Sequence, residues 1–133
     1  MTARAAGVRS IEVQWSGAGN LIFGSGKLDL INAVAEQGAV LIPFDATIKE
    51  VRSRVRTACG TAAGLASLKG VEKGGTAYAS QSHATTDAAG TDLTWAIADA
   101  DVPAGEVLYF AGDGGATGTG DVDVIVVLVP RGN

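Results

Sequence analysis

The feature that most constrains the fold is a repeated two-residue alternation of apolar and polar side chains, interrupted by glycine-rich turns. Leu93, Trp95 and Ile97 alternate with Thr94 and Ala96, which is the periodicity of a strand with one buried face. Residues 10–15 show the same alternation. Nineteen glycines against three prolines supply many tight turns between such segments. The spacing predicts an all-β, antiparallel β-sandwich of eight or nine strands, with a jelly roll as one form of it.

Two segments leave the type of secondary structure open. Residues 46–58 place Ile48, Val51 and Val55 at helical spacing, but their β-branched content favours a strand. In a strand, a bulge near Lys49 would bring Ile48 onto the face of Val51. A helical turn over residues 28–36 is a second open alternative. The last strand, residues 121–129, is so rich in valine that we expect it to be central and buried on both faces.

The length of the chain limits the number of domains, and its net charge limits the kinds of partner that it can bind. A chain of 133 residues fits one domain, and we expect a single sandwich over residues 10–133, preceded by a flexible arm over residues 1–9. The net charge of −4 argues against general binding of nucleic acid. Neither a signal peptide nor an apolar run long enough to cross a membrane is apparent. We therefore expect a protein made in the cytoplasm that remains there or leaves by lysis or assembly.

Few residues are candidates for catalysis or metal binding. His83, the only histidine, lies in a polar stretch that reads as a solvated loop, where a triad with Ser82 and Asp87 would lack rigid support. Cys59, the only cysteine, has no local metal-binding partner and reads as a small buried apolar residue. We expect no catalytic residue, no cofactor and no metal.

The glycine-rich stretch at residues 112–121 leaves one question about ions open. It lacks the lysine and the following helix of a phosphate-binding loop. Asp113, Asp121 and Asp123 are oxygen donors suited to calcium, but their spacing matches neither an EF-hand nor a glycine-aspartate β-roll repeat. A connection between two core strands is the simpler interpretation.

An arginine cluster is the most informative polar feature. On a strand, Arg52, Arg54 and Arg56 would form one stripe about 14 Å long, because alternate residues repeat at roughly 6.8 Å. Three guanidinium groups in a row suit an anionic protein surface, although a solvated sheet face is the simpler alternative. The arm over residues 1–9 adds Arg4 and Arg9, which could become ordered on binding.

Three segments carry a resemblance to a known family. They are LIPFDATIKEVR at residues 41–52, DVPAGEVLYF at residues 101–110 and the valine-rich ending at residues 122–130. In pattern and composition they resemble the small β-sandwich head decoration (cement) proteins of tailed bacteriophages. That resemblance implies a non-enzymatic virion protein on the outside of the capsid, commonly a homotrimer, that binds the major capsid protein.

Related sandwiches in phage tail fibres imply an alternative, which is a module that binds carbohydrate or a receptor. Sugar-binding proteins usually expose tryptophan or tyrosine, whereas Trp15 and Trp95 lie on the apolar phase of their strands. Decoration is therefore the favoured function. Arg4, Arg9, Arg52, Arg54 and Arg56 are the candidate partner-binding residues, with neither nucleic acid nor membrane as a partner.

Overall fold

The computed structural model describes residues 20–131. The predicted strand over residues 10–15 and the arm with Arg4 and Arg9 lie outside the described residues. Within residues 20–131 there is no helix, and hence none long and apolar enough to cross a membrane. The ten strands of this part are β1 (Leu21–Asp29), β2 (Ala33–Ile42), β3 (Ala46–Thr57), β4 (Gly64–Gly70), β5 (Ala77–His83), β6 (Asp92–Thr94), β7 (Ala96–Ile97), β8 (Asp101–Val102), β9 (Glu106–Asp113) and β10 (Asp121–Pro130).

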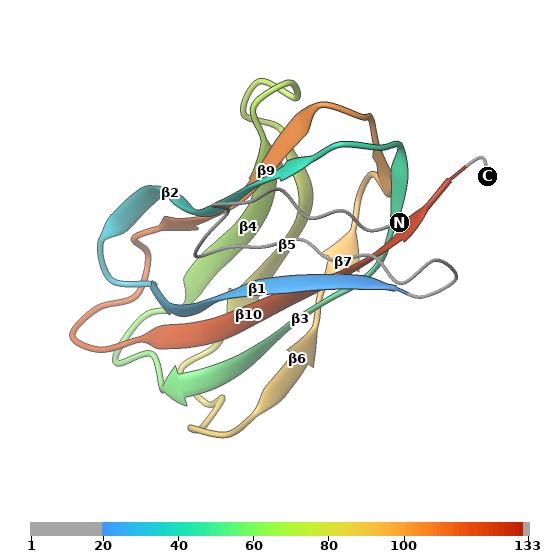
Figure 1. The fold of residues 1–133 in the computed structure, drawn as a ribbon. Helices are drawn as coiled ribbons and strands as arrows, with labels where there is room; N and C mark the ends of the chain where they lie inside the picture. The colour runs from blue at the N-terminus through green and yellow to red at the C-terminus, as the bar shows by residue number, and fades with distance from the viewer. Residues whose placement is uncertain (1–19, 132–133) are drawn as a thin grey trace, which may run out of the picture.

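These strands form two antiparallel sheets packed face to face (Figure 1). Sheet A has the order β1-β10-β3-β6, with β8 also paired to β3, and sheet B has the order β2-β9-β4-β5-β7. The predicted all-β antiparallel sandwich is therefore confirmed. Residues 28–36 form the end of β1, a turn and the start of β2, so the helical alternative for this segment is wrong.

The strand order is that of a jelly roll. Both β6 and β8 pair with β3 and act as one interrupted strand, while the two-residue β7 only extends the edge beside β5. When β6 and β8 are counted as one strand and β7 is left out, eight strands remain. Numbered in chain order, they have the sheet orders 1-8-3-6 and 2-7-4-5. Each sheet thus alternates strands from the two halves of the chain, as two interlocked Greek keys require.

Strand β3 resolves the ambiguity over residues 46–58. It runs without a break from Ala46 to Thr57 and pairs with β10 along its length. The pairing skips Lys49, because Glu50 faces Val127 while Ile48 faces Leu128. The predicted bulge is therefore confirmed, and it places Ile48 and Val51 together in the core.

The core lies between the two sheets and is centred on Phe110. The ring centroids of Phe23 and Trp95 lie 6.2 Å and 6.3 Å from that of Phe110. Alternate valines of β10, including Val122 and Val126, are buried on the same side. Among residues 20–131, no layer covers the outer side of β10, and Ile125 is 40% exposed. The prediction that this strand is central holds, but burial on both faces is wrong.

Candidate docking face

The three arginines of β3 lie on the outer face of sheet A. Arg52, Arg54 and Arg56 are exposed, while Ser53 and Val55 between them are buried. The alternation follows from the pleat of a strand whose other face covers the core. The predicted stripe therefore exists as a geometric feature of the protein.

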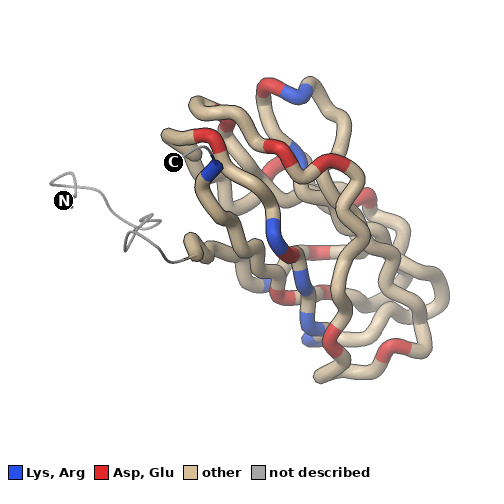
Figure 2. Tube along the Cα trace, turned by 90° about the vertical axis from the view of Figure 1, so that its right-hand side faces the viewer, with Lys and Arg blue, Asp and Glu red and all other residues tan. Residues whose placement is uncertain are grey.

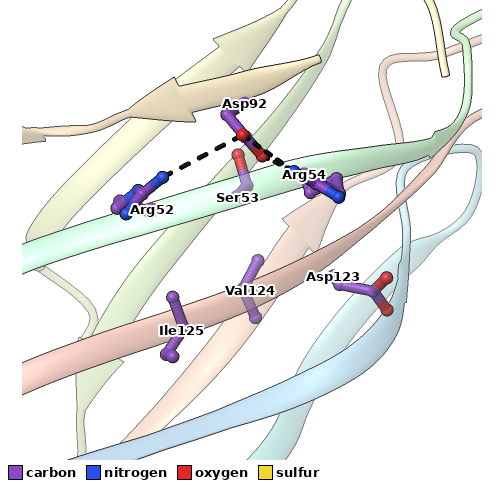
Figure 3. A pocket seen from close by; sticks show the side chains of 7 residues that line it. All are labelled: Arg52, Ser53, Arg54, Asp92, Asp123, Val124 and Ile125. Atoms are coloured by element: carbon purple, nitrogen blue, oxygen red, sulfur yellow. Dashed lines mark hydrogen bonds and ion pairs between the residues drawn. The ribbon is translucent and has the colours of Figure 1, made fainter. Parts of the chain in front are cut away.

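Each arginine is close to a carboxylate, and Arg54 has the tightest pairing (Figure 3). Its Nε and one terminal nitrogen donate to the two oxygens of Asp92 over 2.8 Å and 3.0 Å. Arg52 lies 3.6 Å from a carboxylate oxygen of Glu50 and 4.0 Å from one of Asp92. The bidentate contact with Arg54 lowers the pKa of Asp92, because the guanidinium favours the ionised carboxylate.

Arg56 is held at the other end of the stripe by β10. One of its terminal nitrogens lies 3.4 Å from Oδ1 of Asp123, which also accepts a hydrogen bond from the backbone N–H of Lys27. Figure 2 shows basic and acidic residues interspersed over this part of the molecule. The stripe is consequently a row of ion pairs and not a block of uncompensated positive charge.

A shallow hollow of about 280 Å³ lies in the same face. It runs between β6, β3 and β10, and its lining includes Arg52, Arg54, Asp92, Asp123 and Ile125 (Figure 3). Because Ile125 pairs directly with Arg52 across the two strands, an apolar side chain stands beside the charged row. The hollow is open and mixed in character, which suits contact with another surface better than enclosure of a small molecule.

The apolar part of this face extends from β10 to β1. Ile22 is 57% exposed, and it lies opposite Val127 in the pairing of the two strands. Gly24, opposite Ile125, carries no side chain that could cover it. The exposed Ile22 and Ile125, together with the partly exposed Val127, therefore form an apolar patch next to the arginine row. We use the term docking face for the arginine row and this patch together.

His83 is not in a solvated loop, and that prediction is wrong. It is the last residue of β5 and is 1% exposed. Its Nε2 lies 2.7 Å from Oγ of Ser53, and its Nδ1 lies 3.3 Å from the carbonyl oxygen of Gly64. Ser53 Oγ also accepts a hydrogen bond of 2.9 Å from the indole N–H of Trp95. The polar atoms of this cluster satisfy one another inside the core.

The same contacts define the protonation of His83. Gly64 supplies only a carbonyl, so Nδ1 carries the proton and donates, and Nε2 accepts from the Ser53 hydroxyl. Burial lowers the pKa of His83, which keeps the ring neutral. Although a serine and a histidine in contact form the core of a hydrolase site, both side chains here are enclosed and no substrate can reach them.

A second buried polar cluster, which is not among the sequence-based predictions, surrounds Glu106. This carboxylate is 0% exposed and accepts hydrogen bonds from the Tyr78 hydroxyl at 2.6 Å and from the backbone N–H of Glu72 at 2.8 Å. Burial and the nearby Glu106 raise the pKa of Tyr78. Lys73 covers the Tyr78 ring, 4.8 Å from its centroid, and pairs with Asp99 over 2.6 Å. The cluster ties the β4–β5 turn to the start of β9.

The remaining candidates are structural in this part of the chain. Cys59 is buried, as predicted, and burial raises the pKa of its thiol. Asp113 accepts hydrogen bonds from the backbone N–H groups of Leu65 and Gly115, whereas Asp123 pairs with Arg56. Within residues 20–131, no group of three or more His, Cys, Asp or Glu side chains is arranged to hold a metal ion.

Comparisons with known proteins identify no relative of this chain. No family model matches it, and neither a curated protein nor a solved structure matches it.

Proposed function

We propose that this chain is a non-enzymatic structural protein of a phage virion, which decorates and stabilises the capsid by binding the major capsid protein. The observation that carries the proposal is the docking face, where ordered arginines and an exposed apolar patch share one side of sheet A. The assignment to a virion rests on the resemblance of residues 41–52, 101–110 and 122–130 to decoration proteins.

The composition of the docking face supports a protein partner. An interface core gains from apolar contact and from arginine, while charged rims set orientation and specificity. Ile22 and Ile125 supply the apolar contact, and the arginine row supplies the charged groups that set orientation and specificity. A decoration protein binds at many equivalent lattice positions, so modest contacts at each subunit become strong when copies associate.

The alternative function is a carbohydrate- or receptor-binding module of a tail fibre or tip. Its support is the hollow beside Arg54 and Asp92, whose polar groups could hydrogen-bond a sugar. The aromatic residues weigh against it, because Trp95 and Tyr78 are 3% and 2% exposed. Decoration therefore remains the better-supported function.

The test is co-sedimentation with undecorated capsids of the phage that encodes the chain. Arg54→Glu should weaken binding at least tenfold, because it reverses one charge of the row and repels both Asp92 and an anionic partner. Lys69→Glu is the matched control, since it makes the same change of charge on β4 of sheet B and should bind normally. Deleting residues 2–9 tests the contribution of Arg4 and Arg9 in the same assay.

Two outcomes would contradict the proposal. Binding that is unchanged in both the Arg54→Glu variant and the deletion variant would remove this docking model and favour the fibre-tip alternative. A glycan array that gives specific binding by the unaltered chain would favour the same alternative directly.

The proposed assembly is a homotrimer, at least on the particle. Sedimentation equilibrium of the free chain and electron microscopy of decorated capsids measure this stoichiometry. A monomer in both settings would contradict the homotrimer.

A further inference from the structure

Strand β1 is an edge strand of sheet A with one side unoccupied. It pairs with β10 on one side, and among residues 20–131 no strand pairs with its other side (Figure 1). The backbone N–H and C=O groups along such an edge are a template for a further strand.

The uncovered part of this edge is its first half. Farther along, the pairing is irregular between Ser25 and Leu28, and Lys27 has a φ of 54°. There, the side-chain amide of Gln37 on β2 donates to Ser25 Oγ at 2.7 Å and to the Gly26 carbonyl at 2.8 Å. Residues 21–24 have none of the lysines, prolines or bulges that normally protect an edge.

We propose that residues 10–15 of the same chain dock along this edge as an additional antiparallel strand. The described part begins at Asn20, immediately before β1, so these residues are tethered next to the open edge. The intervening residues 16–20, Ser-Gly-Ala-Gly-Asn, match the length and composition of a five-residue hairpin loop. A short tether strongly favours the segment of the same chain over one from another copy.

The loop length also brings the correct face of the segment inward. A five-residue loop places Trp15 opposite Leu21 and Val13 opposite Phe23, and both β1 residues belong to the core. Gln14 then lies opposite the exposed Ile22, on the outer face. A shift by one residue would instead turn Trp15 and Val13 to the solvent side. Thus the apolar phase of the segment joins the buried phase of β1.

This placement would also bring the N-terminal arm to the docking face. The added strand would start near Ser25, which pairs with Val124, and Val124 pairs with Ser53 between Arg52 and Arg54. Three strand spacings separate the added strand from β3, or about 14 Å. Arg4 and Arg9 could reach the same partner as the arginine row, although the strand addition itself does not depend on the proposed function.

Cysteine pairs test the register in the full chain. In a Cys59→Ala background, Gln14→Cys with Ile22→Cys places two thiols directly opposite each other, at a spacing that a disulfide can bridge. Mild oxidation should form an intramolecular disulfide in most molecules, measured by intact mass and by non-reducing electrophoresis. The matched control, Val13→Cys with Ile22→Cys, places the thiols on opposite faces and should stay mostly reduced.

Each other outcome overturns the inference. Disulfide-linked dimers would assign the edge to a segment of a second copy. Preferential bridging of the control pair would show the opposite register, with Trp15 on the outer face. Slow bridging of both pairs, together with fast hydrogen exchange at those amides of residues 21–24 that point away from β10, would show that the edge stays open.

Discussion

The buried contact between Ser53 and His83 provides the sharpest test of the core. Replacing Ser53 with alanine removes one hydroxyl that serves two partners. The indole N–H of Trp95 loses its acceptor, and Nε2 of His83 loses its donor. Both partners stay enclosed, since Trp95 is 3% and His83 1% exposed, and the space left by one oxygen is too small to admit water readily.

The expected loss follows from these two unsatisfied groups. Leaving a buried donor or acceptor without a partner costs about 1–3 kcal/mol for each group. Some relaxation of the two rings is expected, so we predict that Ser53→Ala lowers the free energy of unfolding by roughly 2–4 kcal/mol. For a domain of this size, that loss corresponds to a decrease in Tm of roughly 8–16 °C.

Urea and thermal unfolding at neutral pH, followed by circular dichroism, measure the effect. Ser67→Ala is the matched control, because Ser67 is a buried serine of β4, 8% exposed, and the structure shows no hydrogen bond of its hydroxyl with another described residue. It should change stability by less than about 0.5 kcal/mol. If Ser53→Ala is as mild as this control, the cluster does not stabilise the fold as argued.

The other predictions concern the same core and its second polar cluster. Burial lowers the pKa of His83 below its ordinary value of 6.5, so the unfolded chain binds the proton first and stability should fall as the pH decreases below 6.5. The loss can reach about 1.4 kcal/mol per pH unit, and urea titrations between pH 7.5 and 5 should show it in the unaltered chain but not in a His83→Gln variant. Gly70→Ala would place a methyl group against the Glu106 carboxylate and 2.8 Å from the Tyr78 ring, and should cost about 1–3 kcal/mol by overpacking. Gly74→Ala, where φ is 66° and a methyl group meets nothing within 4 Å, should cost only the backbone strain, roughly 1–2 kcal/mol. Gly70 has no positive φ, so a Gly70→Ala variant as stable as the unaltered chain would contradict the packing argument.

The two-residue periodicity predicts the strands because successive side chains of a strand point alternately to the core face and to the solvent face. In β3, the identity of each residue is enough to separate Val51 and Val55 from the arginines, and the same reasoning places the bulge near Lys49. The prediction fails at β10, where valines occur on both phases. There, the exposure of Ile125 depends on the absence of a covering layer among the described residues, and its own sequence carries no signal of that absence.

Buried polar residues are harder to predict because their partners are distant in sequence. Ser53 and His83 are 30 residues apart, and Tyr78 and Glu106 are 28 apart. A weak signal was nevertheless present for Glu106, which shares its strand phase with Leu108 and Phe110. Extending the phase of Ala79 to residue 83 would likewise have placed His83 inward. To predict the burial of these two residues, the two-residue alternation must be given more weight than the polarity of the individual side chain.

The arginine row shows that an ion pair which the sequence does not predict changes what Arg54 can bind. The sequence predicts three aligned guanidinium groups, but it does not predict Asp92, which β6 brings beside Arg54 from 38 residues away. An ion pair between side chains that are 63% and 42% exposed contributes little to stability, yet it holds the guanidinium in one orientation. A partner carboxylate must therefore share or displace Asp92 to bind Arg54. For the proposed partner, recognition on this face would then depend on the position of the incoming charge, because an anionic surface without a correctly placed acceptor gains nothing over the pair already present.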